Sequence, residues 1–276
     1  MNHPLIRYHG GKFRIADWII SQFPSHRTYV EPFGGGASVL LAKPPSCVEV
    51  YNDLDNDVVN FFEVLRDNQL SQELAHLIEL TPYSRTEFLN ARTDTTSKVE
   101  QARRLVVRAQ MGFGSAGATK GNTGFRLDTA RGGSDIVTIW QRQPEVILQA
   151  AARFKKVLIE NRNAIKVIQD HDREDTLFFV DPPYVMDTRN TGGKTYRHEM
   201  TDADHNHLIS VLQQCKGMVI VCGYEHPIYE SLKWKKFKKA VAATGQAGSV
   251  MREEVLWINS QAEKQQDLFG TSYDYN

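Results

Sequence analysis

An apolar segment that ends in a carboxylate, two prolines and an aromatic ring constrains this chain most strongly. Residues 177–180 are all apolar, and the run Asp181-Pro182-Pro183-Tyr184 follows them directly. An uninterrupted apolar run is typical of a central parallel strand, and prolines can neither continue a helix nor donate to a strand ladder. We therefore predict a buried strand that carries Asp181 and Tyr184 to the ligand-binding edge of an α/β sheet. An ordinary Asp-Pro turn is the alternative for this segment by itself.

The composition is that of a globular protein with one large domain and room for an insertion. The chain has 276 residues, 41% of them hydrophobic and 24% charged, which argues against long disordered regions. Basic and acidic residues balance at 33 each, so the net charge indicates no partner. Three cysteines without Cys-x-x-Cys spacing favour a reducing cytoplasm and give no metal-binding signature. No apolar segment has transmembrane length, so we expect a cytoplasmic protein that binds neither metal nor membrane.

A glycine-rich turn near the N-terminus indicates a nucleoside-binding site. A short predicted strand, 28–30, is followed by Glu31-Pro32-Phe33-Gly34-Gly35-Gly36 and by an apolar helix start at 39–41. This strand-loop-helix geometry holds nucleotide-like ligands, because glycine lets the backbone approach them closely. The loop lacks both the Gly-x-Gly-x-x-Gly spacing and a Gly-Lys-Ser/Thr ending for phosphate. A ligand without phosphate therefore fits better.

Two further segments carry candidate ligand-binding charges. A second predicted strand, 47–51, ends in Asn52-Asp53-Leu54-Asp55, and an acid at this distance from a glycine loop commonly holds ribose hydroxyls. Either aspartate could instead cap the helix predicted at 58–65, and we assign the ribose to Asp53 and the cap to Asp55. Gly10-Gly11-Lys12 precedes a predicted helix, 15–23, where Lys12 can hold a carboxylate, although a plain turn is the alternative reading.

Taken in chain order, four of these motifs resemble those of the Dam-type DNA adenine-N6 methyltransferases. They are Gly10-Gly11-Lys12, the run from Glu31 to Gly36, Asn52-Asp53 and Asp181-Pro182-Pro183-Tyr184. The resemblance spans about residues 6 to 260 and implies an α/β fold, a Rossmann-like methyltransferase sheet with helices on both faces. It also implies that residues 1–67 and 152–276 form the catalytic domain, and that 68–151 form a small, mostly helical DNA-recognition insertion.

The same resemblance implies S-adenosylmethionine as cofactor. Tyr8 and Lys12 would lie beside its methionine moiety, Glu31 and the glycine loop beneath it, and Asp53 on its ribose. Asn161, after a predicted strand at 157–160, would lie on the adenine side. The implied cofactor set is Tyr8, Lys12, Glu31, Phe33, Gly34, Gly35, Gly36, Asp53, Asn161 and Asp181. Two positions depart from the family pattern: the glycine loop reads Phe-Gly-Gly-Gly rather than Phe-x-Gly-x-Gly, and Arg162 replaces a common aromatic.

The middle of the chain predicts a DNA-binding segment. Helices are expected over 69–111 and over 136–154 with a break at Pro144, and a glycine-rich loop or hairpin is expected over 112–135. Residues 84–143 contain ten Lys or Arg against five Asp or Glu, a basic excess typical of a nucleic-acid-binding surface. A solvated surface is the alternative. The candidate DNA contacts are Lys120, Asn122, Arg126 and Arg131, with arginine and asparagine suited to bases and lysine to phosphate.

The sequence of the C-terminal half predicts a helix, two strands and two segments that each have two interpretations. The helix covers 202–212 with Thr201 as N-cap, and the strands cover 218–222 and 255–258. Tyr196 and His198 could either line the site or lie on the surface. The lysine-rich run 233–239 could be a charged edge strand or a DNA contact. The last fifteen or so residues are expected to be frayed.

These features together predict methyl transfer to adenine in duplex DNA. The amine of adenine is a poor nucleophile, so Asp181 and the carbonyl of Pro182, held rigid with Pro183, are expected to orient it, with Tyr184 stacking on the base. A base must be flipped out of the duplex to reach such a pocket. The alternatives are an RNA adenine-N6 methyltransferase, or a catalytically silent nucleic-acid-binding relative. Expected partners are double-stranded DNA and, for a restriction-linked enzyme of a bacterial or phage-infected cell, a cognate nuclease.

Overall fold

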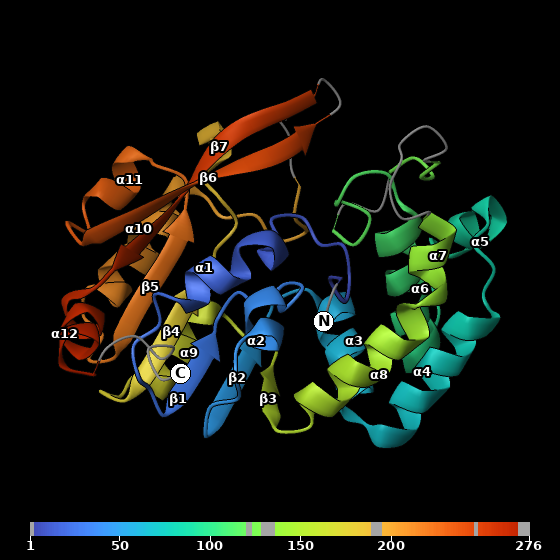
Figure 1. Cartoon of the computed structure of the whole chain (residues 1–276), viewed down its shortest axis with the longest axis horizontal. Coiled ribbons are helices and arrows are strands. Elements are labelled where there is room, and N and C mark those ends of the chain that lie inside the picture. Colours follow the sequence, from blue (N-terminus) through green and yellow to red (C-terminus); the bar gives the residue numbers. More distant parts are fainter. Residues whose placement is uncertain (1–2, 120–122, 128–135, 189–194, 246–247, 270–276) are drawn as a thin grey trace.

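A seven-stranded sheet forms the centre of the part of the chain that the structure describes. The computed structural model describes residues 3–119, 123–127, 136–188, 195–245 and 248–269. In these residues the strand order is β3-β2-β1-β4-β5-β7-β6 (Figure 1). The strands are β1 (Thr28–Glu31), β2 (Val48–Asn52), β3 (Val157–Glu160), β4 (Thr176–Val180), β5 (Met218–Gly223), β6 (Lys235–Gly245) and β7 (Gly248–Ile258).

The predicted apolar strand is β4, and it lies at the centre of the parallel part of the sheet. It pairs in parallel with β1, where Val30 lies opposite Phe178, and with β5, where Val180 lies opposite Val221. All five of its residues are buried, and four of them are apolar, as expected for a strand that is covered on both faces. The two strands at the far edge, β7 and β6, run antiparallel. The Rossmann-like α/β fold is thereby confirmed.

Helices cover both faces of the sheet. Side chains alternate along β4, so Phe179 joins one apolar core and Phe178 joins another on the opposite face. The first core includes residues of α1 (Ala16–Ile20), α2 (Ser38–Ala42), α3 (Asn56–Arg66) and α12 (Ser260–Phe269). The second includes residues of α9 (Ala164–His171), α10 (Asp202–Leu212) and α11 (Pro227–Glu230). The described residues also contain two 3₁₀ turns, Phe13–Ile15 and Met186–Thr188.

Five helices form a group beside the β3 edge of the sheet (Figure 1). They are α4 (Asn68–Leu80), α5 (Arg85–Asn90), α6 (Lys98–Met111), α7 (Ile136–Gln141) and α8 (Gln143–Phe154). The group meets the sheet domain through α3, which packs against α4, α6 and α8. The predicted break near Pro144 is confirmed, because α8 starts with this proline in its first turn, where a missing N–H is tolerated.

The described part of the glycine-rich segment has the geometry of a hairpin. Gly112 and Phe125 form an antiparallel bridge, and the Phe113 N–H donates to the Gly124 carbonyl at 2.7 Å. Residues 112–119 and 123–127 contain no helix, as predicted. Of the four candidate DNA contacts, only Arg126 is described, and Lys120, Asn122 and Arg131 lie outside the described residues.

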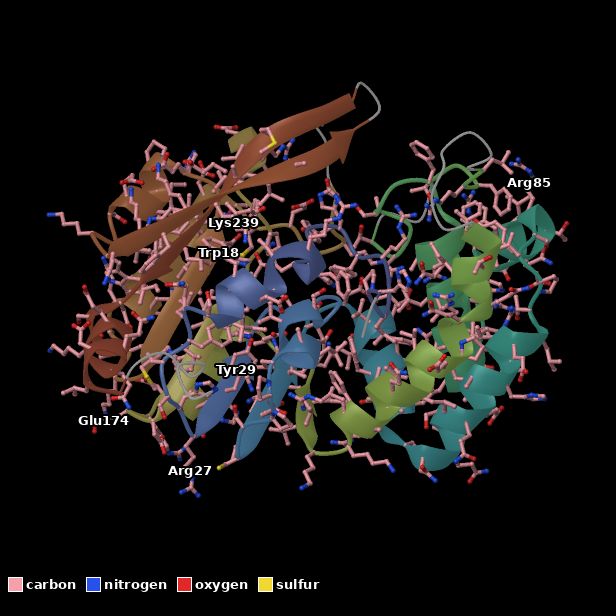
Figure 2. The ribbon with its side chains drawn as sticks, viewed as in Figure 1. Trp18, Arg27, Tyr29, Arg85, Glu174 and Lys239 are labelled. Atoms are coloured by element: carbon pink, nitrogen blue, oxygen red, sulfur yellow. The ribbon has the colours of Figure 1, made fainter. Side chains whose placement is uncertain are left out.

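The lysine-rich run forms the outermost strand of the sheet. Lys236 pairs with Glu230 at 2.5 Å, and Lys238 pairs with Glu225 at 2.8 Å. Lys239 lies over the ring of Trp18, 5.6 Å from its centroid (Figure 2). Lysines paired in this way on an edge strand disfavour pairing with another chain. The contacts favour the edge-strand interpretation of this run.

The C-terminal segment differs in part from its prediction. The expected frayed end is wrong up to residue 269, where α12 continues, Ala262 is fully buried and the Asn259 side chain accepts its N–H; residues 270–276 lie outside the described residues. The predicted strand 255–258 is the end of a longer strand, β7. The predicted cap of α10 is confirmed, because Thr201 and Asp204 form a reciprocal capping box. Within the described residues, no helix has both the length and the apolar character that a membrane span requires.

Candidate active site

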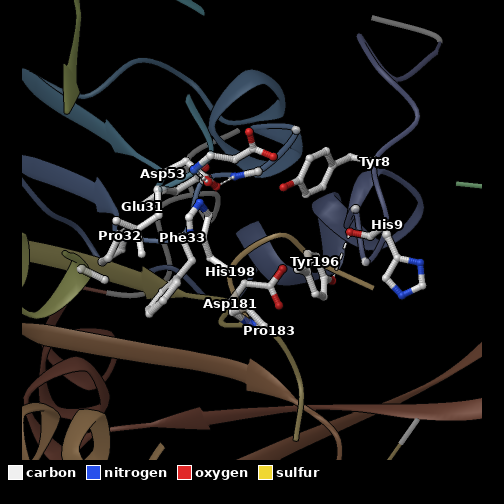
Figure 3. A pocket seen from close by; sticks show the side chains of 18 of the residues that line it. Tyr8, His9, Glu31, Pro32, Phe33, Asp53, Asp181, Pro183, Tyr196 and His198 are labelled. Carbon is white, nitrogen blue, oxygen red and sulfur yellow. Dashed lines mark hydrogen bonds between the residues drawn. The ribbon is translucent and has the colours of Figure 1, made fainter. Parts of the chain in front are cut away.

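A pocket opens at the carboxyl ends of β1, β2 and β4 (Figure 3). Parallel strands end at one edge of a sheet, which brings the segments after them together. The segment 8–12 forms a second wall, and the segment 196–200 forms a third. Among the predicted site residues, the lining includes Tyr8, Lys12, Glu31, Phe33, Gly34, Gly35, Gly36, Asp53, Asp181 and Pro183.

Lys12 and Asp181 form an ion pair inside this pocket. The Lys12 Nζ lies 2.8 Å from Asp181 Oδ2 and donates to the Gly10 carbonyl at 2.6 Å. The lysine side chain is 5% exposed and the aspartate 18%. The other carboxylate oxygen, Oδ1, is buried, and no described residue hydrogen-bonds to it. The pair thus presents one unsatisfied acceptor to the site.

The protonation states follow from burial and from this pairing. Burial raises the pKa of Asp181 to about 6, although the Lys12 ammonium lowers it. Burial acts to lower the pKa of Lys12, but the carboxylates of Asp181 and Glu254 outweigh it and raise that pKa above its ordinary value. At neutral pH the site therefore holds a carboxylate and an ammonium.

The glycine loop leaves space for two tyrosine rings as well as for a ligand. A Cβ on Gly34 would lie 2.1 Å from the ring of Tyr51. Gly35 has a φ of +47°, and a Cβ there would lie 2.7 Å from the ring of Tyr8. The sequence predicted close approach of a ligand only. In the fold, the glycines also let Tyr8 pack against the loop as part of the pocket wall.

Asp53 and Asp55 have different roles, and Asp55 is the helix cap that the sequence predicted. Asp55 accepts the N–H of Asp57 at 3.0 Å and caps α3. Asp53 lines the pocket, and its oxygens accept the backbone N–H groups of Gly35 and Asp55, both at 2.8 Å. Burial raises the pKa of Asp53 to about 6. The two hydrogen bonds fix the orientation of its carboxylate at the end of β2.

Asn161 lies next to the pocket but is absent from its described lining. Its side chain donates to the backbone carbonyl of Asp53 at 2.8 Å, so it supports the loop that carries Asp53. The wall on this side is formed instead by Leu54 and Ala164, which the sequence analysis did not identify. Arg162, which replaces an aromatic of the family pattern, pairs with Glu160 and Asp170, both at 2.9 Å.

Glu31 brings a buried carboxyl group to the pocket. It is 3% exposed and accepts the hydroxyl of Tyr29 at 2.7 Å. Burial raises its pKa to about 8. A group with this pKa is largely protonated at neutral pH and can release its proton when a cation binds beside it.

The segment after the Asp-Pro-Pro-Tyr run crosses the pocket and is tied to both of its other walls. The Tyr196 hydroxyl donates to the His9 carbonyl at 3.2 Å (Figure 3). Arg197 pairs with Asp55 at 2.9 Å and with Asp57 at 2.7 Å. Tyr196 and His198 line the site, which resolves the two alternatives that the sequence left open. No pattern in the sequence indicates Arg197, because its partners lie 140 or more positions away in the chain.

Tyr184 lies just outside the lining of the pocket. Its hydroxyl donates to the Glu254 carboxylate at 2.6 Å, and its ring lies 4.8 Å from the Lys12 ammonium. Pro182 is buried beside it, and Pro183 lines the pocket. Glu254 was missed, although a signal existed. Period-two alternation on β7 puts it on the same face as Leu256 and Ile258, so an inward carboxylate could have been predicted.

The basic segment contributes no residue to the described lining of the pocket, and several of its arginines stabilise helix packing. Arg103 pairs with Glu87 and Glu100, and Arg108 pairs with Asp57. Arg126 is held through its backbone, whose carbonyl accepts the Tyr83 hydroxyl at 3.0 Å. The basic excess of the sequence thus overstates the charge available to a partner. In the described ranges, no group of three or more His, Cys, Asp or Glu is arranged to hold a metal ion.

Comparison with known proteins identifies the relationship. The model of the D12 class N6 adenine-specific DNA methyltransferases matches residues 8–246. No curated protein matches the chain significantly. One solved structure with a similar course is a precorrin 8w decarboxylase from Methanobacterium thermoautotrophicum, which covers 90% of this chain and 89% of its own. Its identity is 8% and its TM-score 0.37, too low to support any argument about this protein.

Proposed function

This chain belongs to the D12 class N6 adenine-specific DNA methyltransferase family, and from that membership we propose a specific reaction and mechanism. The protein methylates the N6 amine of adenine at a specific site in duplex DNA, with S-adenosylmethionine as methyl donor and with the target base flipped out of the helix. The observation that supports this most directly is the buried Lys12–Asp181 pair, with its unsatisfied oxygen at the pocket.

The residues that line the pocket fit such a cofactor. Asp53, a carboxylate at the end of β2, suits two ribose hydroxyls, and Leu54 and Ala164 offer an apolar wall for a purine. Glu31 suits a cationic amino group, which would draw the proton from its carboxyl. Tyr8 and the glycine loop would enclose the methionine moiety. When bound, S-adenosylmethionine supplies an electrophilic methyl group.

Asp181 would orient the amine. The lone pair of the adenine amine is delocalised into the ring, so the site must hold both amine hydrogens to direct it. Asp181 Oδ1 accepts one hydrogen, and the carbonyl of Pro182 accepts the other. Lys12 supports this by holding Oδ2 and by keeping the carboxyl ionised, so that Oδ1 remains an acceptor. Positioning of this kind can supply roughly 7 to 11 kcal/mol of the barrier reduction.

Tyr184 would receive the base. An aromatic ring beside the acceptor can stack on the flipped adenine, and stacking offsets part of the cost of leaving the duplex. Residues 68–151 would recognise the DNA sequence, with Lys120, Asn122, Arg126 and Arg131 as candidate contacts. The charges of the paired arginines on α6 are already used within the protein, which supports assigning contacts to the loop rather than to the helix.

Replacement of Asp181 tests the mechanism. Asp181→Ala should lower methyl transfer by about 100- to 1,000-fold, as loss of a group that orients or stabilises the reacting atoms does. Cofactor affinity, measured by calorimetry, should change much less. Near-normal transfer by a folded Asp181→Ala protein would contradict the role of this residue.

The choice of nucleic acid and the presence of activity need a separate test. Transfer of a labelled methyl group to duplex DNA and to structured RNA distinguishes the proposal from an RNA adenine-N6 methyltransferase. A silent nucleic-acid-binding relative would bind DNA and transfer no label to either. Mapping the modified base in DNA from cells that express the chain would then give the recognised site.

A further inference from the structure

Glu254 is a buried carboxylate behind the Asp-Pro-Pro-Tyr segment that no motif of the sequence includes. It is 8% exposed, and its Oε2 accepts the Tyr184 hydroxyl at 2.6 Å and the Cys222 thiol at 3.6 Å. A buried carboxylate is costly unless hydrogen bonds compensate it. Here the compensating donor belongs to the proposed base-stacking residue.

The antiparallel edge of the sheet brings Glu254 to this position. In the pairing of β5 with β7, Cys222 lies opposite Leu256 and Gly223 opposite Val255. Glu254 follows on the same face as Leu256, which is the face toward Lys12 and Tyr184. The neighbouring Glu253 points to the other face, is half exposed and pairs with Lys238 at 3.0 Å. The two adjacent carboxylates are therefore in opposite environments.

Tyr184 is held on three sides. Its hydroxyl bonds to Glu254, its ring meets Tyr224 edge-on with centroids 4.6 Å apart, and the Lys12 ammonium lies over its face. The same ammonium bonds to Asp181. A short hydrogen bond to a carboxylate is stronger than one between neutral groups. Of these contacts, the bond to Glu254 fixes the position of the hydroxyl end of the ring, whereas Tyr224 and Lys12 limit its rotation about the long axis.

We propose that Glu254 is a positioning residue for methyl transfer. By holding the Tyr184 hydroxyl, it fixes the position of the far end of the ring on which the flipped adenine rests, beside the acceptor oxygen of Asp181. This inference rests on the proposed function. It predicts that the loss of rate in Glu254 variants comes mainly from the loss of the bond to the Tyr184 hydroxyl, which would not be so for a purely structural carboxylate.

A double-mutant comparison tests this dependence. Glu254→Leu removes the acceptor and should lower kcat about 20-fold, whereas Glu254→Gln keeps an acceptor oxygen and should lose no more than about fivefold. Tyr184→Phe removes the donor and should lose about as much as Glu254→Leu. In the Tyr184→Phe background, either change at position 254 should lower kcat by less than about twofold further, because the shared bond is already absent.

Matched measurements separate positioning from stability. Glu253→Gln, on the same strand but facing solvent, should leave kcat unchanged. Cofactor affinity by calorimetry and KM for DNA should stay within about twofold in the Glu254 variants, because Glu254 lies outside the described lining of the pocket. Thermal unfolding shows that each variant is folded at the assay temperature.

The possible results distinguish failure of the role of Glu254 from failure of the proposed function. Wild-type kcat in Tyr184→Phe would overturn the role of Glu254, and this variant leaves β7 intact even if Glu254→Leu does not fold. Losses that multiply in the double variants would overturn it as well, since Glu254 would then act by another route. A wild type that transfers no methyl group to duplex DNA would overturn the proposed function and this inference with it.

Discussion

The ammonium of Lys12 contacts two residues of the Asp-Pro-Pro-Tyr segment at once, bonding to Asp181 and lying over the ring of Tyr184. The family resemblance assigned this lysine to the cofactor. Its contacts give it a second function that the sequence could not indicate, because residues 12 and 181 lie far apart in the chain and only the fold brings them together. A lysine at a helix start predicts a bound carboxylate, but not that the carboxylate is the catalytic one.

Lys12→Met tests this electrostatic role. Lys12 lowers the pKa of Asp181, which burial raises to about 6, so its loss should move that pKa further up. Transfer needs the ionised carboxylate, so the acid limb of the kcat profile should shift from near pH 6 to higher pH. The maximum rate should fall at least about tenfold, because a buried partner is lost. The profile is measured by methyl transfer between pH 5 and 9.

Lys43→Met is a suitable control for this change. Lys43 is also buried and paired, to Glu49 at 2.7 Å, but it lies outside the described lining of the pocket. The Lys43→Met variant should be less stable than the wild type, but the acid limb of its kcat profile should not shift. An unshifted limb in Lys12→Met would show that Lys12 does not set the charge of Asp181.

Glu31 gives the stability of the protein without cofactor a definite pH dependence. Its folded pKa of about 8 lies above its ordinary value of 4.5, so the folded state holds a proton that the unfolded state has lost. The free energy of unfolding should therefore fall as pH rises from 7 to 8, by at most about 1.4 kcal/mol. Denaturant unfolding at these pH values measures it. Glu31→Gln should flatten the slope, whereas the exposed Glu63→Gln should not.

At the scale of elements, the segment 196–200 depends on Arg197. This guanidinium reaches two carboxylates at the start of α3, and one of them, Asp57, also pairs with Arg108 of α6. The third wall of the pocket, segment 196–200, is thus linked both to the start of α3 and, through Asp57, to α6 of the helix group. The sequence predicted a loop over the site but not what holds it, since an isolated arginine in a polar loop has no pattern.

Arg197→Gln should loosen this wall. The side chain is 38% exposed, so we expect its ion pairs to contribute only about 1 kcal/mol, equivalent to roughly a fivefold weaker cofactor affinity. Calorimetry with S-adenosylmethionine measures the change. Arg162→Gln removes an equally exposed arginine that pairs away from the pocket, and it should bind as the wild type does. Equal affinities of the two variants would contradict the role of Arg197.

At the scale of the whole molecule, periodicity predicted the parallel sheet and its covering helices, because each parallel strand is a short apolar run between turn signals. It failed at the antiparallel edge. In β6 and the first part of β7, charged residues stand next to one another rather than alternating with apolar ones, so only 255–258 had a strong signal. The polar sequence of α12 similarly concealed a helix that is anchored by Ala262.

Two sets of three basic residues can be compared to locate the DNA-binding surface. Neutralising Lys120, Arg126 and Arg131 with glutamine should weaken DNA binding. If each contacts a phosphate, the slope of log affinity against log salt should fall by about 2.7 in magnitude. Neutralising Lys235, Lys236 and Lys238 should leave the slope nearly unchanged, because these lysines are paired with glutamates on the edge strand. Fluorescence anisotropy over a salt series measures both. An equal loss in the second set would move the DNA surface to the β6 edge.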